Sequence, residues 1–207
     1  MFGLTKKELA IFKKLSTPIK IQDFLDSFPM NWEKEEETYM SPRLSLREKK
    51  MHCLEGALVA GLALWLKGEE PLLLDLKASG DDDHIVTLYQ RNGYWGAISK
   101  TNHSALRFRD PVYKSIRELA MSFFHEYFVN ETGKKSLRFY GQPLNLKKLG
   151  TDWITTEENL DFIAEALDNV RHFPCFPKSN LKLIRPADEM ERKAGRIIEW
   201  EKSDPRT

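Results

Sequence analysis

Cysteine is scarce in this chain, which has Cys53 and Cys175 as its two thiols among 207 residues. A small domain held together by disulfides needs several closely spaced cysteines, so the sequence excludes that class. The N-terminal residues also lack the uninterrupted apolar run of a secretory signal. We therefore expect a cytoplasmic protein in a reducing compartment.

An excess of charge and a long apolar run are also missing. Lysine and arginine number 32 against 31 aspartates and glutamates, for a formal net charge of +1. This balance predicts no general attraction to nucleic acid or to a membrane surface. The longest apolar run, residues 56–66, is shorter than the roughly 20 residues that cross a bilayer, so we expect a soluble protein.

The patterns along the chain predict a single α+β domain, in which a buried helix packs on a small antiparallel sheet. The core covers about residues 45–105. A helical lead-in over residues 1–44 precedes it, and a helical extension over residues 106–207 follows it. No internal repeat suggests a second domain.

Helical spacing of apolar residues marks the lead-in and the first part of the core. Residues 4–15 form one amphipathic pattern, and Thr17 with Pro18 supplies a cap and first-turn pair for the next helix. Residues 54–65 are apolar on nearly every face, which is typical of a helix buried on all sides.

Strand patterns follow that helix, and a hairpin signal joins two of them at Asn92-Gly93. A two-residue loop there places Ser99 on the same face as His84. A three-residue loop places Asn102 diagonally on that face instead. The predicted strands are residues 71–78, 84–90 and 94–99.

The extension is expected to be mainly helical. Pro111 opens one predicted helix, and a weak capping box at Thr156–Asn159 opens another. A possible strand lies within residues 135–150, and a last helix covers residues 186–202.

Cys53 is the candidate nucleophile. A thiol attacks as its thiolate, and the N-terminal turn of a helix lowers the pKa of a cysteine through its free amide groups and its dipole. Cys53 lies at the start of the predicted buried helix. Its own backbone N–H is placed to donate to an oxyanion.

The candidate base is His84, which begins a predicted strand directly after the acidic run Asp81–Asp83. His52 is badly placed, because adjacent side chains on a helix project about 100° apart. A base needs a partner for its second ring nitrogen. Asn102 and Ser99 are the two candidates, and we choose Asn102 because an amide carbonyl is a good acceptor for an imidazole N–H.

This order of parts resembles the core of the transglutaminase-like superfamily, which shares its Cys, His, Asp or Asn arrangement with papain-like cysteine proteases. The segments HCLEGALVAGLALWL and HIVTLYQRNGYWGAIS carry the resemblance, over about residues 45–105. The segments ISKTNHSALRFRDPVYKS and LAMSFFHEYF are similar to a bacterial transglutaminase-like group of undefined substrate.

The resemblance implies amide-bond chemistry through a thioester on a protein, peptide or small amide substrate, with no metal or cofactor. Cys53 would be the nucleophile and His84 the base. The third position falls near Ser99 or Asn102, where the superfamily usually has an aspartate. This chain has none between His84 and Asp110. That departure suggests an alternative, a catalytically inactive interaction or scaffold module.

The superfamily often places an oxyanion donor upstream of the nucleophile, where this chain has Gln22, Asn31 and Trp32. A second alternative function is a metal-dependent hydrolase that uses the Asp81–His84 cluster. Carboxylates and imidazoles are metal ligands, but the sequence has no CxxC, HxH or HExxH spacing, so we expect no metal.

Overall fold

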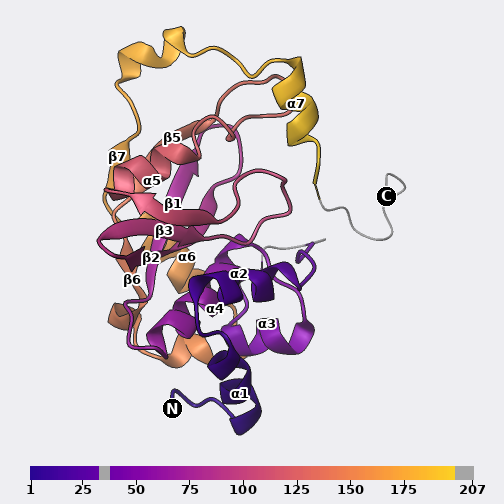
Figure 1. Cartoon of the computed structure of the whole chain (residues 1–207), viewed down its shortest axis with the longest axis vertical. Helices are drawn as coiled ribbons and strands as arrows, with labels where there is room; N and C mark the ends of the chain where they lie inside the picture. The colour runs from indigo at the N-terminus through magenta and orange to yellow at the C-terminus, as the bar shows by residue number, and fades with distance from the viewer. Residues whose placement is uncertain (33–37, 199–207) are drawn as a thin grey trace.

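The structure is a computed structural model that describes residues 1–32 and 38–198. Helices gather on both faces of a seven-stranded sheet, so the predicted α+β class is confirmed (Figure 1). The end of the predicted last helix, residues 199–202, lies outside the described residues.

Three short helices lead to the buried helix, and each begins at a hydroxyl cap. The side chains of Thr5, Thr17 and Ser41 accept backbone N–H groups of the first turns of α1, α2 and α3. The predicted pair of Thr17 and Pro18 is confirmed at the start of α2. The helices are α1 (Lys6–Lys14), α2 (Pro18–Asp26), α3 (Pro42–Glu48) and α4 (Cys53–Trp65).

The sheet has the order β4-β3-β2-β1-β5-β7, β6 also pairs with β1, and these pairings are antiparallel. The three predicted strands are confirmed as β1, β2 and β3, but the sheet is larger than predicted. The strands are β1 (Leu72–Ala78), β2 (His84–Arg91), β3 (Tyr94–Ile98), β4 (Arg109–Tyr113), β5 (Leu137–Gly141), β6 (Leu144–Asn145) and β7 (His172–Pro174).

The C-terminal extension is therefore not mainly helical, because it supplies four of these strands. Without β5 and β6, β1 would leave a long apolar strand at an open edge of the sheet. The first predicted helix of the extension is also wrong at its start. Pro111 lies in β4, an edge strand where a missing N–H is tolerated, and Ser115 caps the helix α5 (Ile116–Ser122).

The remaining elements of the extension are short. The helix predicted from a capping box at Thr156–Asn159 begins later, at α6 (Asp161–Asp168), and Leu160 gives it no side-chain cap. The described part of the predicted last helix forms α7 (Glu189–Gly195). Three 3-10 turns complete the chain at Leu146–Leu149, Asp152–Ile154 and Lys178–Leu183.

The hairpin between β2 and β3 has the two-residue loop. Arg91 pairs with Tyr94, which leaves Asn92 and Gly93 as the loop, with φ of 51° and 82°. Both positive values suit the tight turn that matches the twist of a hairpin, and asparagine and glycine adopt them at low cost. The three-residue alternative, on which the choice of Asn102 depended, is not formed.

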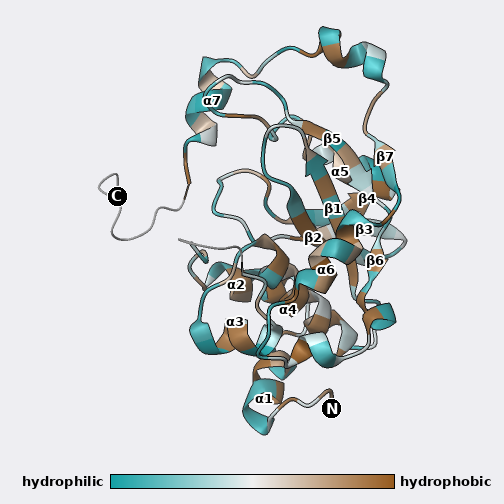
Figure 2. Cartoon of the chain, turned by 180° about the vertical axis from the view of Figure 1, so that it is seen from behind, coloured by the Kyte–Doolittle hydropathy of each residue, from teal (hydrophilic) through white to brown (hydrophobic). Residues whose placement is uncertain are grey.

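The sheet separates two apolar clusters. Leu73 of β1 points to the face covered by α4, while Leu74 and Leu76 point to the face covered by α5. Apolar residues run along the whole of α4, which lies between the sheet and the other N-terminal helices (Figure 2). A helix enclosed in this way holds its first residue in a fixed position.

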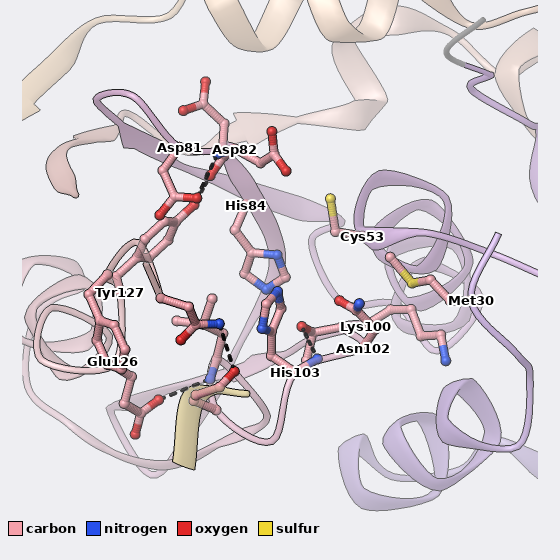
Figure 3. Close-up of a pocket in the computed structure, with 17 residues that line it drawn as sticks. Met30, Cys53, Asp81, Asp82, His84, Lys100, Asn102, His103, Glu126 and Tyr127 are labelled. Carbon is pink, nitrogen blue, oxygen red and sulfur yellow. Dashed lines mark hydrogen bonds between the residues drawn. The ribbon is translucent and has the colours of Figure 1, made fainter. Parts of the chain in front are cut away.

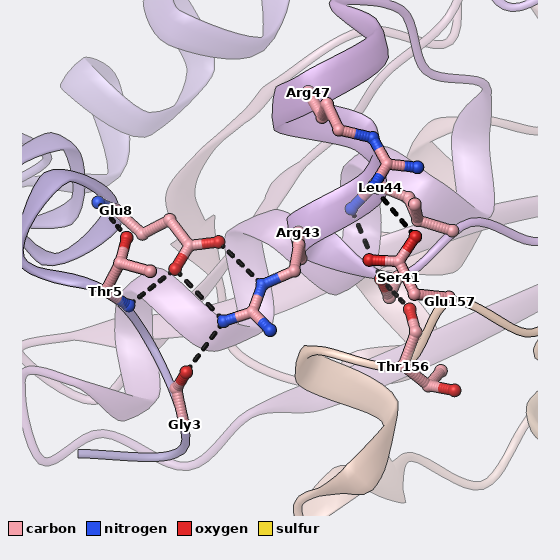
Figure 4. Close-up of polar contacts among 9 residues, drawn as sticks. All are labelled: Gly3, Thr5, Glu8, Ser41, Arg43, Leu44, Arg47, Thr156 and Glu157. Carbon is pink, nitrogen blue, oxygen red and sulfur yellow. Dashed lines mark hydrogen bonds and ion pairs between the residues drawn. The ribbon is translucent and has the colours of Figure 1, made fainter.

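Ion pairs tie the N-terminal segment and residues 156–157 to α3 (Figure 4). Arg43 binds Glu8 at 2.8 Å and the carbonyl of Gly3 at 2.7 Å. The Arg43 guanidinium holds the pKa of the Glu8 carboxyl well below its usual range, at about 2. Arg47 binds Glu157 at 2.7 Å in the same region. These contacts brace the helix that leads into α4.

Within the described residues, no helix has the length and the apolar character needed to cross a membrane.

Candidate active site

Cys53 is the first residue of α4, and His52 is its cap. His52 has extended backbone angles, so its ring folds back over the first turn instead of projecting away as predicted for a helical neighbour. Its Nδ1 accepts the N–H of Leu54 at 3.1 Å, and its Nε2 lies 2.6 Å from the carbonyl oxygen of Thr38. Both ring nitrogens are therefore engaged, and the ring is fixed at the start of α4, beside Cys53.

Cys53 begins α4 and His84 begins β2, and the contact between the two elements keeps these starts near each other. The Thr87 hydroxyl donates to the Ala57 carbonyl at 2.7 Å, which ties one turn of the helix to the middle of the strand. One turn back along α4 lies Cys53, and three residues back along β2 lies His84, distances of about 6 and 10 Å. His84 pairs with Leu76 and so lies on the face of β2 opposite to Thr87, and at the open end of the strand it lines one cavity with Cys53.

The orientation of the His84 ring follows from a chain of hydrogen bonds. The Ser99 hydroxyl lies 2.6 Å from the Leu106 carbonyl and 2.8 Å from His84 Nε2. Its single proton goes to the carbonyl, which accepts only, so His84 Nε2 must be the donor to Ser99. In the neutral ring the lone pair is then on Nδ1, the nitrogen left for Cys53. Ser99 therefore holds His84 in the tautomer that a base requires.

Asn102 does not fill the orienting position that we chose for it. In the two-residue register Ser99 shares the face of His84, and the described hydrogen bond of the His84 ring goes to Ser99. Asn102 lines the same pocket. Asn102 offers the better acceptor, but Ser99 is the side chain that meets His84, because the strand register decides which side chains lie together.

Replacing Ser99 with alanine is expected to raise the apparent pKa of Cys53 by about 1 unit, while Asn102→Ala leaves it unchanged. A hydrogen bond to an ionised group contributes about 1.5–3 kcal/mol, and loss of the Ser99 acceptor removes part of this support from the His84 imidazolium. The pH dependence of Cys53 alkylation by iodoacetamide, resolved by mass spectrometry, measures the change. Equal profiles for the two variants would contradict the assignment of Ser99.

The electrostatics of the site favour a thiolate. Burial raises the pKa of the Cys53 thiol, but hydrogen bonds from His52 and His84 and the charge of both rings outweigh it and lower that pKa to about 5. Burial raises the pKa of Cys175 to about 11, and the nearby arginines offset only part of that rise. Both cysteines are free, so the chain itself contains a reactive thiol and an inert one.

Glu55 is a part of the site that the sequence reasoning missed. Its carboxylate is fully buried and accepts the backbone N–H groups of His52 and Met40 at 2.8 and 3.0 Å. Asn31 also donates to it, at 3.3 Å. The signal in the sequence was a single charged residue in an apolar helix, three positions after the cap, as in a capping box.

Two of the upstream residues considered as oxyanion donors, Asn31 and Gln22, use their amide groups in hydrogen bonds within the protein. The Asn31 amide donates to Glu55, and the Gln22 amide donates to the Ser99 carbonyl at 2.8 Å and to Asp26. Gln22 also accepts the Ser99 N–H at 2.9 Å, so it positions the residue that orients His84. Among the described hydrogen bonds the Cys53 N–H has no acceptor, as an oxyanion donor requires.

Cys53 lies between two cavities. One, of about 190 Å³, is lined by Cys53, His84, Asn102 and His103, and Figure 3 shows these side chains around it. The other, of about 450 Å³, is lined by Cys53 and His52 at one side and by several aspartates. A substrate that reaches the thiol can therefore extend to both sides of it.

The metal site weighed as an alternative at Asp81–His84 is not assembled in the described part of the chain. Asp81 accepts the Ser136 hydroxyl at 2.6 Å, and His84 hydrogen-bonds to Ser99. Among the described residues, the acidic groups that converge within 4.8 Å are those of Asp75, Asp83 and Asp168. This cluster lies in the larger cavity and shares only Asp83 with the predicted one.

Comparison with known proteins indicates no function for this chain, so a function can be inferred only from the geometry of the site. Neither the known protein-family models nor the curated proteins include a match to this chain.

Proposed function

We propose that this protein performs cysteine-nucleophile chemistry on an amide or peptide bond, by acyl transfer or hydrolysis through a thioester. The observation that carries the proposal is that Cys53, at the start of a buried helix, lines one cavity with His84, whose ring hydrogen-bonds to Ser99. It supplies a low-pKa thiol, a base of fixed tautomer and an acceptor behind the base.

In the proposed reaction the Cys53 thiolate attacks the carbonyl carbon of the amide. The Cys53 N–H donates to the oxyanion, and the C–N bond then breaks as the His84 imidazolium gives its proton to the leaving amine. Water or a second amine, losing a proton to His84, next attacks the thioester carbon. The acyl group leaves with its new partner and the thiolate is restored.

The arrangement suggests a transglutaminase-like fold. A cysteine opens a buried helix, a histidine opens a strand beneath it, and the next strand returns a polar partner. Serine takes the place where the superfamily usually has an aspartate, so the imidazolium here would be stabilised by a neutral dipole. Because the chemistry requires a reduced thiol, we propose that the protein acts in a reducing compartment such as the cytoplasm.

The proposal is tested with an activated acyl ester, p-nitrophenyl acetate, as the acyl donor. We expect rapid acetylation of Cys53, detected by mass spectrometry, followed by continued release of acetate to water. Cys53→Ala should remove both events, and Cys175 should stay unmodified as the internal control.

Acetylation of Cys53 without continued turnover would contradict the enzyme proposal. It would favour the alternative of a catalytically inactive scaffold that keeps the fold and the thiol. Turnover retained by Cys53→Ala would exclude the thioester route altogether.

A further inference from the structure

The smaller cavity beside Cys53 has one wall that comes from the C-terminal part of the chain. Gly195, the last residue of α7, lines this cavity together with Cys53 and His84, and Figure 3 shows the segment in yellow at the edge of the pocket. The cavity holds about 190 Å³, less than the roughly 300–1,000 Å³ typical of small-molecule sites. A peptide therefore fits on this side of the thiol only when a wall moves.

The C-terminal wall is held by backbone contacts of the kind that join strands. The Ser104 N–H donates to the Ile197 carbonyl at 2.9 Å, and His103 pairs with Ile198 in an antiparallel bridge. The Ser104 hydroxyl donates to the Ala194 carbonyl at 3.0 Å. None of these contacts uses a side chain of the C-terminal segment. An extended peptide of another sequence can make the same contacts, as in recognition by strand addition.

Asn130 provides a second observation that favours a peptide. Its Nδ2 donates to the Gly195 carbonyl at 3.0 Å, while its Oδ1 is buried and has no hydrogen-bond partner among the described residues. Gly195 itself covers that oxygen, because a Cβ built on Gly195 would lie 2.4 Å from it. A buried amide oxygen without a donor is unfavourable. A peptide that presents both a carbonyl and an N–H to Asn130 would satisfy the whole amide, whereas the C-terminal segment satisfies half of it.

The C-terminal wall is also weakly buried. No residue of α7 is buried, and Ile197 after it is 65% exposed. The start of the segment is anchored, because Ala187 is buried and donates its N–H to the Gly133 carbonyl at 2.8 Å. Segments with few buried apolar contacts open at a low cost in free energy. The residues after Ala187 can therefore move away while the start of the segment stays attached.

We propose that residues 194–198 form a strap that occupies the place of an extended peptide substrate beside Cys53, and that a peptide binds there by displacing the strap. This inference rests on the proposed function for the role of the thiol and names its substrate class. The peptide takes over the N–H and the hydroxyl of Ser104 and both groups of the Asn130 amide. The closed strap lowers the apparent affinity for peptides, because only the open fraction of the protein binds them.

Gly195→Ala in the full chain tests whether the strap can be displaced. The added Cβ would lie 2.4 Å from Asn130 Oδ1 and 3.0 Å from the Phe128 ring, so it pushes the strap off the cavity, while alanine keeps the helix propensity of α7. We expect NMR to show hydrogen exchange of the Ser104 amide accelerated about tenfold.

The controls separate displacement of the strap from loss of folding. The Leu106 N–H, bound to Glu126 at 3.0 Å in the same loop, should keep its exchange rate. Arg192→Met removes two hydrogen bonds from α7 to backbone carbonyls and should act in the same direction as Gly195→Ala. Lys193→Ala is the matched control, since this exposed lysine pairs with Glu189 of its own helix, and it should change nothing.

Peptide binding is measured in the Cys53→Ala background, where no chemistry follows. The probe is a fluorescein-labelled peptide with the sequence of residues 188–198. Fluorescence polarisation should give about tenfold tighter binding when Gly195→Ala is added to the protein, because the tethered strap no longer competes. The same peptide carrying the Gly195→Ala change should bind about tenfold more weakly, since its own Cβ meets Asn130.

Unchanged exchange of the Ser104 amide in both Gly195→Ala and Arg192→Met would overturn the inference. So would equal affinity of the probe for the proteins with and without Gly195→Ala. The two proposals fail separately, because exchange and peptide binding need no acyl transfer. Acetylation of Cys53 by a small ester, in turn, does not require the strap to open.

Discussion

Replacing His84 with alanine is expected to raise the apparent pKa of Cys53 from about 5 by at least 2 units and to lower acyl turnover about 1,000-fold. The variant loses the neighbouring imidazole that lowers the pKa of the thiol, while His52 stays in place as the helix cap. It also loses the group that moves protons to the leaving amine and from water.

The measurement for this prediction is the full pH profile of Cys53 alkylation, together with steady-state turnover of p-nitrophenyl acetate. A rate at a single pH is a poor readout, because a thiolate of higher pKa is scarcer but intrinsically more nucleophilic. The midpoint of the profile reports the pKa directly.

His103→Ala is the matched control, since His103 lines the same cavity and is not among the groups that shift the Cys53 pKa. It should shift the apparent pKa of Cys53 by no more than about 0.3 units and change turnover by no more than about twofold. A His84→Ala protein whose midpoint stays near 5 would show that His52 alone sustains the thiolate, and retained turnover would remove His84 from the mechanism.

Gly56→Ala is expected to have the largest effect on stability, a loss of about 3 kcal/mol in the free energy of unfolding. A Cβ on Gly56 would lie 2.4 Å from Lys100 Cβ, which is too close for two carbons. Lys100 is 1% exposed, and its ammonium donates to the Phe28 carbonyl at 2.6 Å, so its stem has little freedom to move. The strain would displace the neighbouring Ser99 as well.

Gly61→Ala is the control for this substitution in the same helix. Its Cβ would meet the Leu146 Cδ1 at 3.1 Å, the far end of a flexible side chain. Alanine also gains about 1 kcal/mol of helix propensity over glycine. We expect urea unfolding to give a change within about 1 kcal/mol for Gly61→Ala, and similar losses in both variants would contradict the special role of the Gly56 contact.

Local features of the fold could be predicted where short-range chemistry decides them. The caps at Thr17 and Pro18, the buried helix that starts at Cys53 and the strands after it depend on neighbours in the chain. Their apolar spacing and capping groups act over one or two turns. The possible strand within residues 135–150 is confirmed as β5 and β6, but β4 and β7 were not predicted, because each forms by pairing with another strand of the sheet.

The pairing of Cys53 and His84 in one proposed site follows from the order of helix and strands. The identity of the third residue did not, because the two hairpin loops were equally compatible with the residues at 91–93. A shift of one residue in register exchanges Ser99 for Asn102 on the face of His84. The contact of His52 with Cys53 depended on the extended backbone at the cap, which a helical projection does not represent.

The sequence by itself determined the α+β class, the helix that carries Cys53 and the strand that carries His84, because each follows from contacts between residues close in the chain. The tertiary structure decided that Ser99 orients His84, that Glu55 and Gln22 brace the site, and that Asp75, Asp83 and Asp168 gather beside the thiol. These groups come from separate elements. Their meeting depends on strand register and on the packing of α4 and α6 against the sheet, which spacing along the chain does not specify.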